Sequence, residues 1–116
     1  MLDWLKQFGG KPDHPLRDAQ AAQEVLAGLP EEPSLETLEQ ISHWIASVKD
    51  TPGFACDDRL AVMRLLDQAA AVHAGPLFEQ FFSKIHQQDR ATRNIWEALC
   101  ECWGRLAEGY AQCVAD

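Results

Sequence analysis

Large apolar side chains recur at intervals of three and four residues from Leu16 to Cys113, and this spacing constrains the fold more than any other feature of the sequence. Such a period places side chains on one face of an α-helix, whereas a half-buried β-strand alternates every second residue. No alternating run rich in Val, Ile and Thr interrupts the pattern. The sequence therefore predicts an all-α fold: a bundle of four to five helices, mostly antiparallel, with a short N-terminal helical arm. A short stack of antiparallel helix pairs is the alternative architecture.

Capping and turn-forming residues divide the chain, whose length suits a single domain spanning residues 1–116. Pro15 suits the first position of a helix, Ser34 is a typical N-cap, and Asp57 or Asp58 opens the next helix. Gly75-Pro76 predicts a helix end, because proline lacks the amide donor. The predicted segments are an arm at 1–12 and helices at 13–29, 34–49, 57–74, 76–88 and 90–114. Whether the last two helices are continuous stays open, since Gln87-Gln88-Asp89 suits a turn or a polar helix face.

The last predicted helix carries a seven-residue repeat of the kind seen at a helix-packing seam. Trp96, Trp103 and Tyr110 recur every seven residues. Leu99, Leu106 and Cys113 recur with the same period. We expect this seam to pack against the other helices of the domain, which would place Trp96 and Trp103 in the core.

The distribution of charge argues against two classes of partner. The formal net charge is −8, and residues 1–58 carry 4 basic and 11 acidic side chains. Such a surface repels nucleic-acid phosphates and anionic lipid headgroups, so neither nucleic acid nor a membrane is an expected partner. Residues 1–10 lack the apolar core of a signal peptide, and no stretch approaches the roughly 18 apolar residues that span a bilayer. Four cysteines without paired spacing indicate reduced thiols, and hence a cytoplasmic protein.

No recognisable motif supplies catalytic, cofactor or metal chemistry. Apart from Gly9-Gly10, glycines occur singly, so there is no phosphate-binding loop. The histidines are widely separated, and Cys100 and Cys102 would point about 200° apart on a helix, too far to share a metal. The sequence therefore predicts no catalytic residue, no cofactor and no metal site.

Partly exposed tryptophan beside acidic residues is typical of a partner-binding anchor, and two segments offer this combination. We expect a protein partner, or self-association, to involve Trp4 and Phe8 in the N-terminal arm. In the helix at 34–49, the candidates are Trp44, Glu36 and Glu39.

The alternative hypothesis is a small-ligand-binding bundle, or an enzyme without a recognisable motif. Its pocket would be lined by Phe78, Phe81, Phe82 and Trp96, with a histidine nearby.

Several strings resemble the helical regions of certain proteobacterial proteins: residues 14–18, Leu29-Pro30, residues 47–54, Arg59-Leu60, residues 65–67, and Trp96 with Trp103, Tyr110 and Cys113. In such proteins the helical region can precede PilZ-type domains, which respond to cyclic di-GMP. The resemblance implies a regulatory accessory module, such as the N-terminal part of a larger signalling protein, and not the sensor itself. The PilZ motifs, Arg-x-x-x-Arg and Asp/Asn-x-Ser-x-x-Gly, are missing, and Arg90 and Arg93 are three residues apart. We therefore assign these arginines no nucleotide contact.

Overall fold

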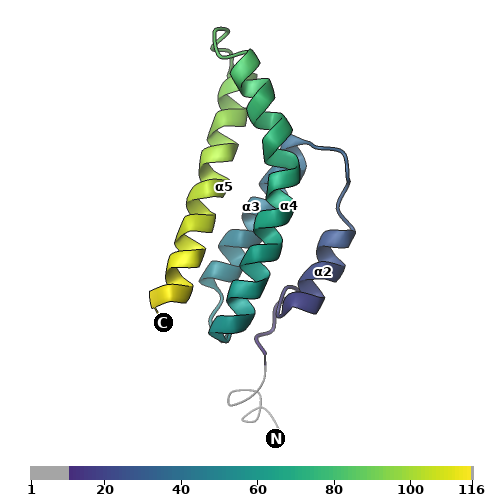
Figure 1. Ribbon diagram of the computed structural model, residues 1–116, viewed down its shortest axis with the longest axis vertical. Helices are drawn as coiled ribbons and strands as arrows, with labels where there is room; N and C mark the ends of the chain where they lie inside the picture. The colour runs from purple at the N-terminus through teal and green to yellow at the C-terminus, as the bar shows by residue number, and fades with distance from the viewer. Residues whose placement is uncertain (1–10, 116) are drawn as a thin grey trace, which may run out of the picture.

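The computed structural model describes residues 11–115, which contain the helices α2 (Ala19–Ala27), α3 (Leu35–Asp50), α4 (Cys56–Ser83) and α5 (Arg90–Ala115), shown in Figure 1. This part of the chain contains no strand, which confirms the all-α prediction. Helices α3, α4 and α5 are antiparallel to their neighbours in the chain and contact one another, while α2 packs on α4 and runs in the same direction. The predicted arm, apart from residues 11 and 12, lies outside the described residues.

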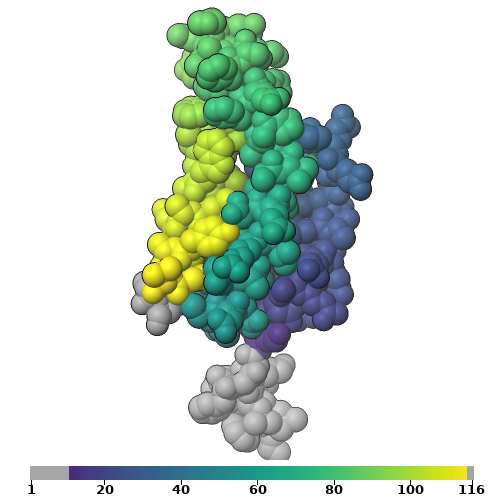
Figure 2. Space-filling model, viewed as in Figure 1, coloured from purple at the N-terminus to yellow at the C-terminus, as the bar shows by residue number. Residues whose placement is uncertain are grey.

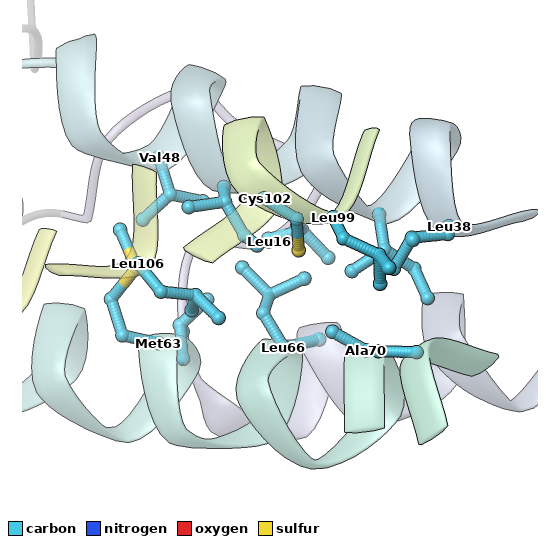
Figure 3. Packing of buried hydrophobic residues seen from close by; sticks show 14 of the residues in the cluster. Leu16, Leu38, Val48, Met63, Leu66, Ala70, Leu99, Cys102 and Leu106 are labelled. Carbon is cyan, nitrogen blue, oxygen red and sulfur yellow. The ribbon is translucent and has the colours of Figure 1, made fainter. Parts of the chain in front are cut away.

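A single core fills the space between α3, α4 and α5, and it is completed by Leu16 from the segment that precedes α2. Figure 3 shows these side chains meeting from all sides. Leu16, Leu38, Leu66 and Leu99 have no exposed surface. Helix α4 therefore occupies a central position, because it contacts α2 on one side and both α3 and α5 on the other.

The predicted helix at 13–29 is wrong in its N-terminal boundary, because regular helix begins only at Ala19. Asp18 provides the N-cap, and its carboxylate accepts a hydrogen bond from the Ala21 amide at 2.8 Å. Before it, Nδ1 of His14 accepts the Leu16 amide at 2.9 Å, which holds residues 13–18 in turns. A side chain that binds the backbone locally in this way competes with helix formation.

Helix α3 begins where Ser34 predicts. The Ser34 hydroxyl accepts a hydrogen bond from the Thr37 amide at 3.1 Å, which satisfies one free donor of the first turn. The Ser34 amide in turn donates to Nδ1 of the buried His73 at 3.2 Å. The start of α3 is thereby attached to the middle of α4.

The predicted break at Gly75-Pro76 is also wrong, since α4 continues through Pro76 to Ser83. Gly75 and Pro76 both lie on the exposed side of the helix, where water can satisfy the carbonyl that loses its partner. Ala74 and Leu77, on the buried side, pack into the core. This packing compensates for the roughly 3 kcal/mol by which proline disfavours a helix interior.

Residues 84–89 form the turn between α4 and α5, so the predicted helices at 76–88 and 90–114 are not continuous. Gln88 adopts a left-handed backbone conformation with φ of 52°. The Asp89 carboxylate then accepts the Thr92 amide at 2.7 Å and so caps the start of α5. Gln87-Gln88-Asp89 is therefore a turn and not a polar helix face.

Candidate protein-interaction surface

Helices α4 and α5 form a hairpin whose closed end extends past the start of α3. Figure 1 shows this end standing clear of the other helices, and in Figure 2 the green atoms of the hairpin rise above the blue segments. At this end two helices must bury apolar side chains without a third. An apolar stripe that is too wide for one neighbouring helix to cover then stays partly exposed to water.

Five aromatic rings form a continuous chain across this hairpin. Phe78 lies 6.2 Å from Phe82 and 6.2 Å from Trp103, between ring centroids. Trp103 contacts Trp96 edge to face at 6.5 Å, and Trp96 stacks on Phe81 at 4.9 Å. Although the rings touch one another, Phe82 is 65% exposed and Trp96 and Trp103 are 41% and 43% exposed.

The expectation that Trp96 and Trp103 belong to the core is therefore wrong. The other half of the predicted seam, formed by Leu99, Leu106 and Cys113, is buried. The two halves differ because the side of α5 that carries the tryptophans faces the edge of α4 and solvent, where no third helix of residues 11–115 covers it. The four aromatic residues that the alternative hypothesis assigned to a pocket likewise do not enclose one, because Phe78, Phe82 and Trp96 lie on the surface.

Exposed uncharged residues follow a heptad-like spacing on both helices of the hairpin. On α4 this series is Ala71, Gly75, Phe78 and Phe82, and Ile85 in the turn that follows continues the spacing. On α5 the series is Trp96, Cys100, Trp103, Ala107 and Val114. We call these ten residues the α4–α5 face. Successive intervals of three and four residues with no charge are typical of a helix-packing seam and not of a solvated surface.

Four charged side chains of α5, those of Glu97, Glu101, Arg105 and Glu108, lie on the opposite side, toward α3. Arg105 forms an ion pair with Glu101 and donates to the Ser42 hydroxyl at 2.9 Å. Lys49 of α3 binds Glu108 at 2.7 Å, and this pairing raises the pKa of the lysine and lowers the pKa of the glutamate. The α4–α5 face is thus the side of the hairpin that faces away from α3.

The predicted partner-binding residues of α3 do come together. Glu36, Glu39 and Trp44 line one hollow of about 550 Å³ along the outer side of α3, with Gln40, His43 and Ser47. Both glutamates are exposed, while Trp44 is partly buried and its ring lies 5.9 Å from that of His14. The Trp44 indole Nε1 is buried without a hydrogen-bond partner. The other two candidates, Trp4 and Phe8, lie outside the described residues.

The thiols divide into two buried groups, Cys102 and Cys113, and two exposed groups, Cys56 and Cys100. Burial raises the pKa of Cys102 to about 11, so this thiol stays protonated and unreactive at neutral pH. Cys100 is exposed on the α4–α5 face, and Cys56 is exposed at the start of α4. Within residues 11–115, no group of three His, Cys, Asp or Glu side chains is arranged to hold a metal ion.

Comparison with protein families decides the relationship. The family model described as the N-terminal domain of the cyclic-di-GMP receptor FimW matches residues 20–116. The chain belongs to this family. No curated protein and no solved structure matches it.

Membership of the FimW N-terminal domain family confirms the resemblance to helical regions associated with cyclic di-GMP signalling. It also confirms the interpretation of the chain as a regulatory module from the N-terminal part of a signalling protein. The name of the FimW family refers to the receptor, so the family match does not itself locate the nucleotide on this domain. In the described part of the chain, no helix has the length and apolar character needed to cross a membrane.

Sequence reasoning missed the α4–α5 face, although a signal for it is present. Helix α5 carries two apolar stripes: a buried one through Leu99 and Leu106, and an exposed one through Trp96 and Trp103. Within a small bundle, a helix needs one stripe to reach the core. The second stripe in a FimW N-terminal domain therefore points to a further contact.

Proposed function

We propose that the chain is a non-catalytic regulatory domain that docks a helical surface of a protein through the α4–α5 face. The observation that carries this proposal is the exposed chain of aromatic rings on a face without charge. Four of these rings, those of Phe78, Phe82, Trp96 and Trp103, are at least 40% exposed. Tryptophan and other aromatic residues dominate the energetics of protein interfaces, while charged residues are depleted from interface centres.

The spacing of the face supports a helix as the docked element. Residues at alternating intervals of three and four on each helix form grooves and ridges that accept another helix. Small residues, Gly75 on α4 and Cys100 and Ala107 on α5, lie between the large rings. They allow the backbone of a docked helix to approach closely beside the aromatic side chains.

We place recognition of cyclic di-GMP outside this domain. The arginines nearest to the face, Arg90 and Arg93, line an open hollow of only about 230 Å³ together with Asn94 and Glu97. The negative charge of the Glu97 carboxylate would repel a phosphate group in this hollow. Titration of the purified chain with cyclic di-GMP in a calorimeter should give no binding heat. Binding that is lost in Arg93→Gln would contradict this assignment.

Two exposed thiols allow a test of docking that does not require the partner to be known. Cys100 lies in the middle of the α4–α5 face, whereas Cys56 lies at the start of α4, where its thiol donates to the Cys113 carbonyl at 3.0 Å, far along the hairpin from the aromatic rings. We expect maleimide in living cells to modify Cys100 several-fold more slowly, relative to Cys56, than it does in dilute purified protein. The modified fractions are measured by mass spectrometry of the recovered chain.

Phe82→Glu supplies the matched variant, because Phe82 is 65% exposed and a carboxylate there interrupts the face without disturbing the core. Val72→Glu is the control, since Val72 is 55% exposed on the same helix but lies on the side where α2 packs. In cells, Phe82→Glu should restore the labelling ratio of free protein, and Val72→Glu should leave the ratio low. Equal ratios in cells and in dilute solution would overturn the docking proposal.

We propose a second contact, for a cationic protein segment, at the hollow formed by Glu36, Glu39 and Trp44. Its support is the combination of two exposed carboxylates with a partly buried tryptophan on one helix side. A lysine-rich peptide should bind the purified chain in a salt-dependent manner, and Glu36→Gln/Glu39→Gln should weaken binding by several-fold. Glu24→Gln, on α2, is the control and should bind as the wild type does. Salt-independent binding, or binding unaffected by the double substitution, would contradict this assignment.

A further inference from the structure

We infer that the helical surface docked on the α4–α5 face is the same face of a second copy of this domain. This inference rests on the proposed function and names its partner. Two hairpins that meet through these faces form an antiparallel four-helix bundle, a common arrangement in which each pair of helices covers the other. The same patch then serves on both subunits, as a two-fold symmetric dimer requires.

The register of the hairpin makes the face complementary to itself. Ring contacts join Phe78 to Trp103, and the Tyr110 hydroxyl donates to Asp67 at 2.9 Å. With α4 and α5 antiparallel in this register, Phe78 lies level with Cys100, and Gly75 lies level with Trp103. A two-fold axis along the hairpin places α4 of one copy on α5 of the other. Phe78 then faces Cys100 of the other copy and Trp103 faces Gly75, while Phe82 and Trp96, which the same register brings level, face each other across the interface.

The charge distribution favours the approach of two copies through this face. Residues 59–116, which contain almost all of α4 and α5, carry 6 basic and 7 acidic side chains. Residues 1–58 carry 4 and 11, so the electrostatic repulsion between copies is concentrated in the other half. A symmetric interface also brings residues near the axis against their own copies, where a charge would repel itself. The ten residues that define the α4–α5 face are uncharged, and the same spacing on α5 reaches a charge only at Arg93, three residues before Trp96.

The exposed aromatic area fits a dimer that dissociates on dilution. Four rings that are 40–65% exposed, at roughly 150–250 Å² for a whole aromatic side chain, leave about 400 Å² of aromatic surface in water. That value is within the range of the largest apolar patch on a monomer, about 300–600 Å². Two copies would bury about twice as much, together with the small residues between the rings. The total lies near the lower limit of stable interfaces, about 1,000–1,200 Å², so we expect micromolar affinity.

Sedimentation equilibrium of the purified chain over a concentration series tests the inference. We expect the protein to be mostly monomeric at a concentration of about 1 µM and mostly dimeric at about 300 µM, as micromolar affinity implies. The labelling of Cys100 should slow as the dimer forms, while that of Cys56 should not change. Phe82→Glu should raise the dissociation constant of the dimer by at least about tenfold, because dimer formation would then bury an unpaired charge. Val72→Glu should leave the dissociation constant unchanged.

The outcomes separate this inference from the docking proposal. A chain that stays monomeric throughout the series overturns the second copy as the partner, and protection of Cys100 in cells would then show that another protein docks. A dimer that leaves Cys100 unprotected and resists Phe82→Glu uses a different surface, which also overturns the inference. Because Phe82→Glu could unfold the end of the hairpin, Trp103→Gln repeats the test with an uncharged side chain. Circular dichroism confirms that each variant remains helical.

Discussion

At the scale of single residues, two glycines in α5 have opposite surroundings. A Cβ atom at Gly109 would lie 2.7 Å from Cε of the buried Met63, whereas a Cβ atom at Gly104 would meet nothing within 4 Å. Gly109 therefore permits the close approach of α4 and α5, and Gly104 has no such role. Glycine disfavours a helix interior by roughly 0.8–1.0 kcal/mol relative to alanine.

Gly104→Ala should accordingly stabilise the domain by about 0.5–1 kcal/mol through helix propensity alone. Gly109→Ala should give less than this, or destabilise the domain, because Met63 must move within a packed core. Urea unfolding followed by circular dichroism measures both free energies. Equal stabilisation by the two substitutions would show that α4 and α5 are further apart than described here.

Two buried histidines make the stability of the domain dependent on pH. Nδ1 of His14 and Nδ1 of His73 each accept a backbone amide, and burial lowers the pKa of both side chains from 6.5. The folded state thus holds them neutral, while the unfolded chain takes up protons as the pH falls through 6.5. Their contribution to stability is fully present above that pH and is lost below it.

The free energy of unfolding should therefore fall between pH 7 and pH 5, above the range in which carboxylates titrate. In His73→Gln the slope over this interval should be smaller, whatever the absolute stability of the variant. His86→Gln, at an exposed position, is the control and should retain the wild-type slope. Denaturant titrations at several pH values supply the measurement, and a flat wild-type profile would refute the assignment.

At the scale of helices and turns, the sequence predicted which segments are helical better than it predicted where they end. Ser34 was a reliable signal because its hydroxyl acts locally, on an amide three residues away. Gly75-Pro76 was misleading because its effect depends on tertiary context: the buried neighbours Ala74 and Leu77 hold the helix together across the proline. The start of α2 was predicted too early, at Pro15, because the observed N-cap is Asp18, whose carboxylate accepts the Ala21 amide.

Pro76→Ala tests that explanation of α4. The substitution provides an amide that can donate to the Val72 carbonyl, and it removes the clash of the proline ring with that carbonyl. We expect stabilisation of about 1–3 kcal/mol with no change in helix boundaries, as measured by thermal unfolding and by amide hydrogen exchange across residues 72–80. A loss of stability would show that the proline has a structural role in α4.

At the scale of the whole molecule, the sequence could predict an all-α bundle but not which apolar stripe would remain outside it. The series that begins with Trp96 and the series that begins with Leu99 both have a seven-residue period. Only the arrangement of three helices shows that the leucine series is covered and that Trp96 and Trp103 are not. That Glu36, Glu39 and Trp44 share one hollow follows from their spacing on a single helix, while their role in binding stays a prediction. Contacts between distant segments, such as Phe78 with Trp103, cannot be derived from local spacing.

The central claim is that the aromatic rings of the α4–α5 face are exposed in the free domain and covered when the domain docks. The variant Trp4→Phe/Trp44→Phe leaves Trp96 and Trp103 as the only tryptophans, so that their fluorescence reports on the face alone. Quenching of this fluorescence by acrylamide, measured as the protein concentration increases, tests the claim most directly. We predict strong quenching near about 1 µM that falls several-fold near about 300 µM, in parallel with dimer formation. Weak quenching and blue-shifted emission in the dilute protein would place both rings in the core and contradict the account.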